Sequence, residues 1–150
     1  PTRGLLGFRS EFLTDTRGMG VMNYVFSEYG PDAGDFKTRK NGVMIVKEPC
    51  TVAGYALFNL QDRGKLFLGP GVNVYRGQIV GENARECDMV VNPGKEKKLS
   101  NMRASGSDEN IMLTPPTEMT LEDCIAYIEN DELVEVTPLA IRLRKKAMKP

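Results

Sequence analysis

Short apolar runs, each bounded by Gly, Pro or Asn, recur along most of the chain and constrain its fold class. Runs of this length and setting are typical of short strands. Few segments show helical spacing, and strands and helices do not alternate regularly. The sequence therefore predicts an α+β fold with a mostly antiparallel or barrel-like sheet. The expected strands are 21–29, 43–46, 66–68, 78–80, 89–91, 133–136 and 139–143.

Two turns are expected between these strands. Gly69-Pro70-Gly71 has the composition of a tight turn, and it lacks the further residues that a nucleotide-binding loop requires. Thr137-Pro138 favours an antiparallel hairpin of the last two strands, although Pro138 could instead open a longer connection. In the final strand, Arg142 and Arg144 would point away from the apolar face and be displayed to solvent.

Helical spacing appears in two segments of the first half. In 8–17, apolar side chains share one face and Gly18 supplies a stop. In 53–60, apolar residues fall at i, i+3, i+4 and i+7. The residues that carry these two patterns are Phe8, Phe12, Leu13, Ala53, Ala56, Leu57 and Leu60.

A third helix is expected after Met119. Thr120 and Asp123 have the spacing of a capping box, which satisfies backbone donors at a helix start. The buried stripe is expected to comprise Leu121, Cys124, Ile125 and Ile128. Cys124 is therefore interpreted as a core residue rather than a reactive thiol.

The first thirty residues form a separate unit in the pattern. One helix and one strand are followed by the turn-rich segment 30–35. A lone helix and strand cannot close a core, so we interpret this unit as the second half of an α+β domain whose exposed apolar face needs a partner. The chain begins at Pro1 rather than Met, which also suggests a piece of a longer protein.

Composition excludes several classes of site. Because histidine is absent, Ser/His/Asp and Cys/His nucleophiles and histidine metal sites are impossible. The three cysteines are far apart and odd in number, which favours neither zinc nor a disulfide framework and fits a reducing compartment. Asp131-Glu132 is expected to face solvent, with nothing apolar beside it to raise a pKa. No apolar run is long enough to span a bilayer, and no signal peptide is recognisable.

The segment 95–105, called here the basic loop, carries the strongest functional signal. It combines cations, hydroxyls and an amide without helical or strand periodicity, as loops that bind phosphates do. A solvated surface loop is the alternative reading of such a charge run. Few apolar side chains lie in 93–110, so we expect it to be mobile until phosphates neutralise its charge. The candidate RNA-binding residues are Lys95, Lys97, Lys98, Ser100, Asn101, Arg103, Ser105, Arg142 and Arg144.

Four segments resemble the TypA/BipA family of ribosome-associated translational GTPases, and the resemblance covers essentially the whole chain. They are PTRGLLGFRSEFLTDTRG at 1–18, FNLQDRGKLFLGPG at 58–71, KKLSNMRASG at 97–106 and ELVEVTP at 132–138.

This resemblance implies a C-terminal fragment of such a GTPase. Residues 1–32 would be the C-terminal half of the ferredoxin-like domain shared with elongation factor G, where it is domain V, and 33–150 the family-specific domain with two helices. The basic loop would reach ribosomal RNA and the transfer RNA acceptor end in the aminoacyl site. The implied role is in translation or ribosome assembly under stress, in the cytoplasm and away from membranes.

The resemblance also implies which parts are absent. GTP and magnesium would belong to the GTPase domain, so this fragment is expected to hold no cofactor or metal, to have no catalytic residue, and to work with the missing N-terminal domains of the same chain. A protein-interaction module without direct RNA contact is the main alternative, and an unrecognised hydrolase is another.

The isolated chain is therefore expected neither to bind nor to hydrolyse GTP, because it lacks the phosphate-binding loop and the magnesium-holding residues that phosphoryl transfer requires. Calorimetry with GTP and magnesium measures this directly. Micromolar binding would contradict the expectation and would mean that Gly69-Pro70-Gly71 is more than a tight turn.

Overall fold

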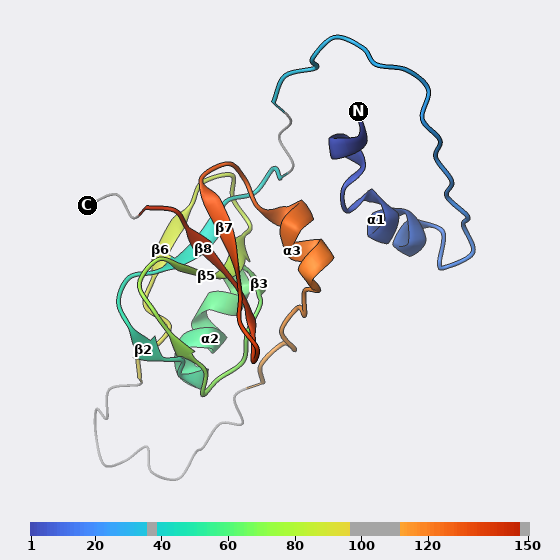
Figure 1. The fold of residues 1–150 in the computed structure, drawn as a ribbon. Helices are drawn as coiled ribbons and strands as arrows, with labels where there is room; N and C mark the ends of the chain where they lie inside the picture. The colour runs from blue at the N-terminus through green and yellow to red at the C-terminus, as the bar shows by residue number, and fades with distance from the viewer. Residues whose placement is uncertain (36–38, 97–111, 148–150) are drawn as a thin grey trace, which may run out of the picture.

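The computed structural model describes residues 1–35, 39–96 and 112–147. The described residues form three α-helices, two short 3-10 helices and a set of short strands (Figure 1), which confirms the α+β class. The helices are η1 (Thr2–Leu5), α1 (Phe8–Asp15), α2 (Gly54–Leu60), η2 (Gln61–Arg63) and α3 (Leu121–Tyr127). The strands are β1 (Val43–Val46), β2 (Cys50–Thr51), β3 (Gly64–Leu66), β4 (Asn73–Val74), β5 (Gln78–Asn83), β6 (Met89–Val91), β7 (Glu132–Val136) and β8 (Ile141–Lys145).

The main sheet is built around β5. Its strand order is β6-β1-β5-β8-β7, and β3 also pairs with β5, while β2 and β4 form a separate two-stranded sheet. Among the described strands only the β1–β6 pairing is parallel, so the expectation of a mostly antiparallel sheet is confirmed. Within those ranges the sheet does not close into a barrel, because β6 and β7 end its order.

Strand β1 is buried on both faces and separates two cores. Met44 and Val46 pack on the side of α2, in a cluster that includes Leu57. Val43 and Ile45 pack in a second cluster with residues of α3 and β8. Because successive side chains of a strand point to opposite faces, a continuous apolar run of this kind needs a cover on each face. Figure 1 shows α2 and α3 in different places around the sheet, and the clusters assign one helix to each core.

All three expected helices are present. Gly18 has a φ of +78°, and its N–H donates to Leu13 O at 2.7 Å. The expected stop at Gly18 is therefore confirmed, although α1 itself ends at Asp15. Thr120 and Asp123 form the expected capping box.

The predicted buried stripe of α3 is wrong at two positions. Cys124 is 3% exposed and Ile128 packs partly buried beside it, but Leu121 and Ile125 are 41% and 48% exposed. Spacing identifies an apolar face, but the elements that pack against the helix decide how much of that face is buried.

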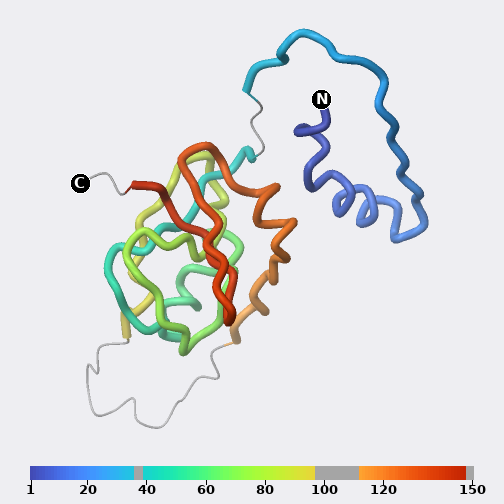
Figure 2. The backbone as a smooth tube through the Cα atoms, in the orientation of Figure 1, coloured from blue at the N-terminus to red at the C-terminus, as the bar shows by residue number. Residues whose placement is uncertain are grey.

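The expected strand at 21–29 is also wrong. The segment is described but has no strand pairing, and its apolar side chains are largely exposed. Alternation favours an extended backbone, but a strand also needs a neighbour for its backbone groups, and none lies beside this segment in the described ranges. Figure 2 shows it as an open path that connects the N-terminal helix to the rest of the chain.

The other expected strands are present with small shifts. β3 begins two residues before the expected 66–68, and β5 is longer than the expected 78–80. The final hairpin is confirmed: Val136 pairs with Ile141, and Thr137 N donates to Ala140 O at 2.9 Å. The Gly69-Pro70-Gly71 segment contains the expected turn, and Gly71 has a φ of +84° that favours glycine.

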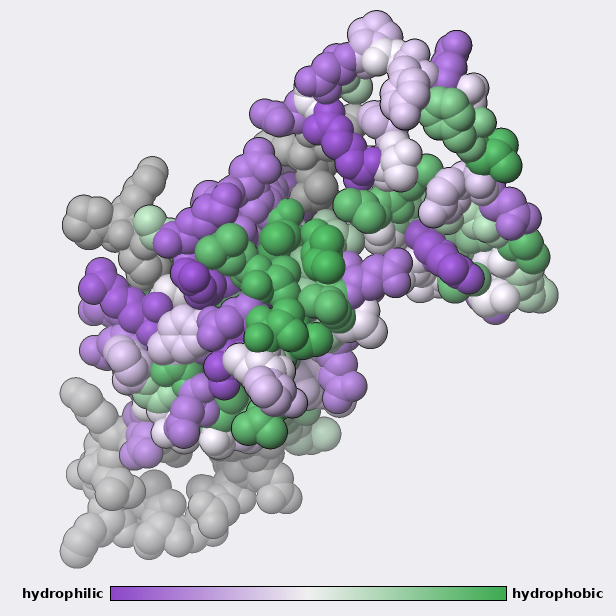
Figure 3. Space-filling model, in the orientation of Figure 1, coloured by the Kyte–Doolittle hydropathy of each residue, from purple (hydrophilic) through white to green (hydrophobic). Residues whose placement is uncertain are grey.

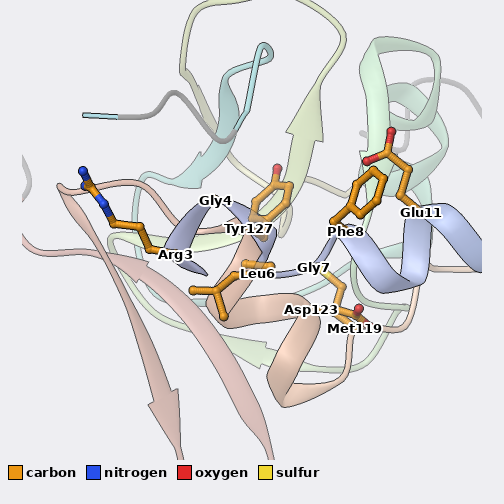
Figure 4. Close-up of a pocket in the computed structure, with 10 residues that line it drawn as sticks. Arg3, Gly4, Leu6, Gly7, Phe8, Glu11, Met119, Asp123 and Tyr127 are labelled. Atoms are coloured by element: carbon orange, nitrogen blue, oxygen red, sulfur yellow. The ribbon is translucent and has the colours of Figure 1, made fainter. Parts of the chain in front are cut away.

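The N-terminal helix lies against α3. An added Cβ on Gly7 would lie 2.5 Å from Ala126 Cβ, and Ser10 Oγ donates to Asp123 Oδ1 at 3.4 Å. Figure 4 shows the pocket at this contact, which Leu6 and Phe8 of the N-terminal segment line together with Tyr127 of α3. A hollow of about 450 Å³ remains between the N-terminal segment and α3, beside the contacts of Gly7 and Ser10.

A buried carboxylate, Glu132 at the start of β7, connects segments that are distant in sequence. Its side chain is 0% exposed. Arg39 Nη2 and Nη1 donate to its two oxygens at 2.7 and 2.9 Å, and Lys145 Nζ donates to Oε1 at 2.9 Å. The Arg39 guanidinium also lies 4.5 Å from the ring centroid of Tyr127. This cluster therefore joins the segment before β1 to α3, β7 and β8.

Lys145 extends the cluster to two further carboxylates, those of Asp131 and Asp88. Its Nζ lies 2.9 Å from Asp131 Oδ2 and 2.7 Å from Asp88 Oδ2. The other oxygen of Asp88 accepts from Val43 N at 3.0 Å. The charged cluster thus also fixes the start of β1 and the residue before β6.

The expectation that Asp131-Glu132 faces solvent holds for Asp131, whose side chain is 67% exposed, and is wrong for Glu132. Burial alone would raise the pKa of Glu132, but hydrogen bonds from Arg39 and Lys145 outweigh burial and lower it. Burial also acts against the charge of Lys145, whose pKa its carboxylate partners nevertheless raise.

Replacement of Glu132 by alanine should destabilise the protein by about 3–5 kcal/mol, because two buried cations lose their shared partner. Urea unfolding at neutral pH measures the loss. Glu118→Ala removes an exposed carboxylate before α3 and should change stability by less than about 0.5 kcal/mol.

The same carboxylate predicts the acid side of the stability curve. The folded pKa of Glu132 lies below the unfolded value of about 4.3, so its contribution is complete above that pH and is lost as the pH falls through the folded value. Glu132→Gln should therefore lose less stability than wild type between neutral pH and about pH 3. Equal losses would contradict this role.

Gly7→Ala should loosen the contact between α1 and α3, since its new methyl group would meet Ala126. Gly18→Ala is a matched control, because its φ of +78° equals that of Gly7 within a degree and nothing lies within 4 Å of its added Cβ. Hydrogen exchange in Leu121–Tyr127 should accelerate in the first variant only. Equal acceleration in both would show that backbone strain, not the contact, causes the change.

Candidate nucleic-acid interface

The segment that leads into the basic loop is fixed to the N-terminus of α2. Pro93 is fully buried, and its carbonyl accepts from Ala53 N at 2.8 Å. An added Cβ on Gly94 would lie 2.5 Å from Cys50 Cβ, so the backbone passes close to β2. The expectation that 93–110 is mobile is therefore wrong at its first two residues, and from 97 to 110 it lies outside the described residues.

The segment that leaves the loop is fixed to the other end of α2. Gln61 Nε2 donates to Met112 O at 3.1 Å, and Gln61 Oε1 accepts from Thr114 N at 2.9 Å. Leu113, between them, packs against the core cluster that contains Leu57. Since Ala53 and Gln61 are the two cap residues of α2, one short helix fixes both flanks of the loop.

Most candidate RNA-binding residues lie in the part of the chain that the structure leaves undescribed. Lys95 is exposed at the described start of the basic loop. The others in the loop, which lie outside the described residues, are Lys97, Lys98, Ser100, Asn101, Arg103 and Ser105.

Arg142 and Arg144 lie together on β8. Their side chains are 35% and 38% exposed, and each lies 3.9 Å from a carboxylate oxygen of Glu135. The expected display of these arginines is therefore correct only in part: the alternation with buried Leu143 is present, but both cations are half-buried beside an acid. Among the described contacts, none joins this pair to Lys95.

Tyr75, between β4 and β5, completes the group around Glu135. Its hydroxyl donates a short hydrogen bond to Glu135. Burial, the bond to Glu135 and the charge of that carboxylate raise the pKa of Tyr75 to about 12, so the phenol keeps its proton at neutral pH. Glu135 thus has three partners on this surface, which reduces the positive potential that Arg142 and Arg144 present to an anion.

A hollow of about 540 Å³ lies between α2 and β6, next to Lys95. Tyr55, Asn59 and Arg63 line it from the helical side. Composition alone did not identify these three residues as a site. Their spacing of four residues was the available signal, because residues at i, i+4 and i+8 share one face of a helix.

The described residues contain no group of three or more His, Cys, Asp or Glu side chains that could hold a metal ion. All three cysteines are free. In the same ranges, no helix has the length and apolar character needed to cross a membrane.

Comparison with known sequences identifies the class of domain. The family model described as the TypA/BipA C-terminal domain matches residues 41–150. The chain belongs to this family. The boundary at 41 falls within the family-specific domain expected from 33, while the assignment of 1–32 to a ferredoxin-like half-domain stays a prediction.

Individual relatives support the same membership. The chain is 53% identical over 147 residues to the large ribosomal subunit assembly factor BipA of Escherichia coli K12, which covers 97% of this chain and 24% of that protein. It is 50% identical over 149 residues to the protein of the same name from Synechocystis, and the match covers 99% of this chain and 25% of that protein. It is also 50% identical over 149 residues to the Haemophilus influenzae protein of that name, and the match covers 99% of this chain and 24% of that protein. The chain thus spans about a quarter of the length of these curated relatives.

Proposed function

We propose that this chain is a ribosome-docking domain that contacts RNA through its basic loop and acts without chemistry of its own. The whole protein is then a GTPase that uses GTP and magnesium on domains outside this chain. Its role is in assembly of the large ribosomal subunit or in translation under stress, in the cytoplasm. This proposal takes its partner from the relatives, which are named as large-subunit assembly factors.

One observation about the chain carries the proposal: a segment rich in cations is held at both ends by the same helix. Ala53 and Gln61 fix the two flanks through backbone groups and a side-chain amide. The loop would then present its cations Lys95, Lys97, Lys98 and Arg103 from a firm base. Binding loops are commonly placed in this way on rigid elements.

The loop would act by position and charge. Lysines neutralise phosphates as point charges, and Arg103 can grip a phosphate with two donors or stack on a base. Ser100, Asn101 and Ser105 add short hydrogen-bonding groups. We propose that the loop reaches the aminoacyl site and the transfer RNA acceptor end, where specificity comes from the shape of the RNA.

An exposed apolar surface favours the alternative, a protein-interaction module. Figure 3 shows apolar surface over the region of α3 and the β7–β8 hairpin. Exposed apolar side chains of these elements are Leu121, Ile125, Val136, Leu139 and Ile141. Such a surface can bind protein, so the test below separates the two functions by the charge of the loop.

Affinity for large ribosomal subunits should depend steeply on salt through the loop cations. If Lys95, Lys97, Lys98 and Arg103 each neutralise one phosphate, log affinity should fall against log salt with a slope of about −3. Replacement of all four by alanine should remove most of that slope. Sedimentation with purified subunits over a range of salt measures both quantities.

A second quadruple variant controls for net charge. Lys47, Lys65, Arg76 and Arg85 are exposed and lie outside the loop, and their replacement removes the same charge. This variant should keep nearly all the salt dependence. Wild-type affinity in the loop variant would reject the RNA-contacting role, and loss of affinity on replacing Ile125 and Leu139 by serine would then favour the protein-interaction module.

A further inference from the structure

We infer that the hollow between α2 and β6 binds one unstacked nucleotide of single-stranded RNA, with its base against Tyr55 and its phosphate between Arg63 and Lys95. The inference rests on the proposed RNA-contacting function and adds a second point of contact beside the loop. It is carried by residues that the structure describes, and of the basic loop it uses only Lys95, the first residue.

A row of three different groups lines the helical wall. Tyr55, Asn59 and Arg63 follow one another at intervals of four residues along α2 and η2, so an aromatic ring, an amide and a guanidinium lie on one face. Asn59 Nδ2 donates to Tyr55 O at 2.9 Å, which orients the amide and leaves its oxygen as an acceptor. Ring, amide and cation are the three groups that single-stranded RNA sites combine.

The charge of the lining selects an anion. Arg63 and Lys95 line the hollow, and no carboxylate does. Arg63 Nη1 lies 3.7 Å from Met89 Sδ, and within the described residues Arg63 forms no ion pair with a carboxylate. In a chain whose formal net charge is zero, two cations without an acidic neighbour in the lining produce a local positive potential.

The rest of the lining suits a base. Leu60, Met89 and Val90 supply apolar surface, and Val90 is 57% exposed. A volume of about 540 Å³ lies within the usual range for sites that hold a small organic group. A base that stacks on an aromatic side chain must first leave its own helix, so the site distinguishes single strands from duplexes.

The opposite wall is firmly held. Asn92, which also lines the hollow, donates from Nδ2 to Glu48 Oε1 at 2.9 Å and accepts at Oδ1 from Gly94 N at 3.1 Å. Both ends of its amide are thus engaged, and it shapes the site rather than reading the base. Recognition is left to Asn59 and the two cations.

The test compares a fluorescein-labelled single-stranded octaribonucleotide with a twelve-base-pair RNA duplex, by anisotropy with the whole chain. Arg63→Gln should weaken binding of the octamer at least about threefold and flatten its salt slope by about 0.7. Tyr55→Leu should weaken the octamer at least about fivefold and leave the duplex unchanged, because stacking needs a free base.

Arg85→Gln is the matched control. Arg85 and Arg63 both line a neighbouring hollow beside β5 and β6, but only Arg63 also lines the α2–β6 hollow. The control should bind the octamer like wild type. Arg63 is exposed, so the Arg63→Gln result stands even if Tyr55→Leu proves unstable.

The possible outcomes separate the inference from the proposed function. If both hollow variants bind the octamer like wild type while the quadruple loop variant loses subunit binding, the inference is wrong and the proposed function stands. If wild type binds neither RNA nor subunits, both are wrong. If the hollow variants lose subunit binding but keep octamer binding, the hollow contacts a ribosomal protein and the inference is again overturned.

Discussion

The interaction on which the rest of the structure depends is the buried ion cluster of Glu132, Arg39 and Lys145. A carboxylate removed from water is tolerated only where cations and donors replace its hydration, and here Arg39, Lys145 and the backbone N–H of Glu129 do so. Because the partners come from before β1, from β8 and from the turn after α3, the charges can be satisfied only when these segments are assembled. The cluster thus disfavours any packing in which the core between β1 and α3 forms before Arg39, β7 and β8 are in place.

The sequence predicts best where a local rule and the packing agree. Thr120 and Asp123 form their capping box because both members of that motif lie within one turn of a helix. The hairpin at Thr137 is equally local. The prediction of α2 from its apolar spacing succeeds for another reason. This helix covers the face of β1 that carries Met44 and Val46, so the packing agrees with the spacing.

Prediction fails where the decisive partner is remote. Nothing near Glu132 indicates that Arg39 lies beside it, since 93 residues separate them. The segment 21–29 has the alternation of a strand but no neighbour to pair with. For the candidate site, composition identified the basic loop, whereas the row of Tyr55, Asn59 and Arg63 mixes an aromatic, an amide and a cation, and no single property marks it as a face.

The attachment of both loop flanks to one short helix has a consequence for change over time. The closure cost of a loop rises only logarithmically with its length, by about 0.6 kcal/mol for each doubling. Residues between Lys95 and Met112 can therefore be inserted, deleted or exchanged while Ala53 and Gln61 go on holding the same two flanks. Under the proposed function, such a loop is free to follow the shape of its target in different lineages, because the scaffold carries the stability and the loop would carry the contacts.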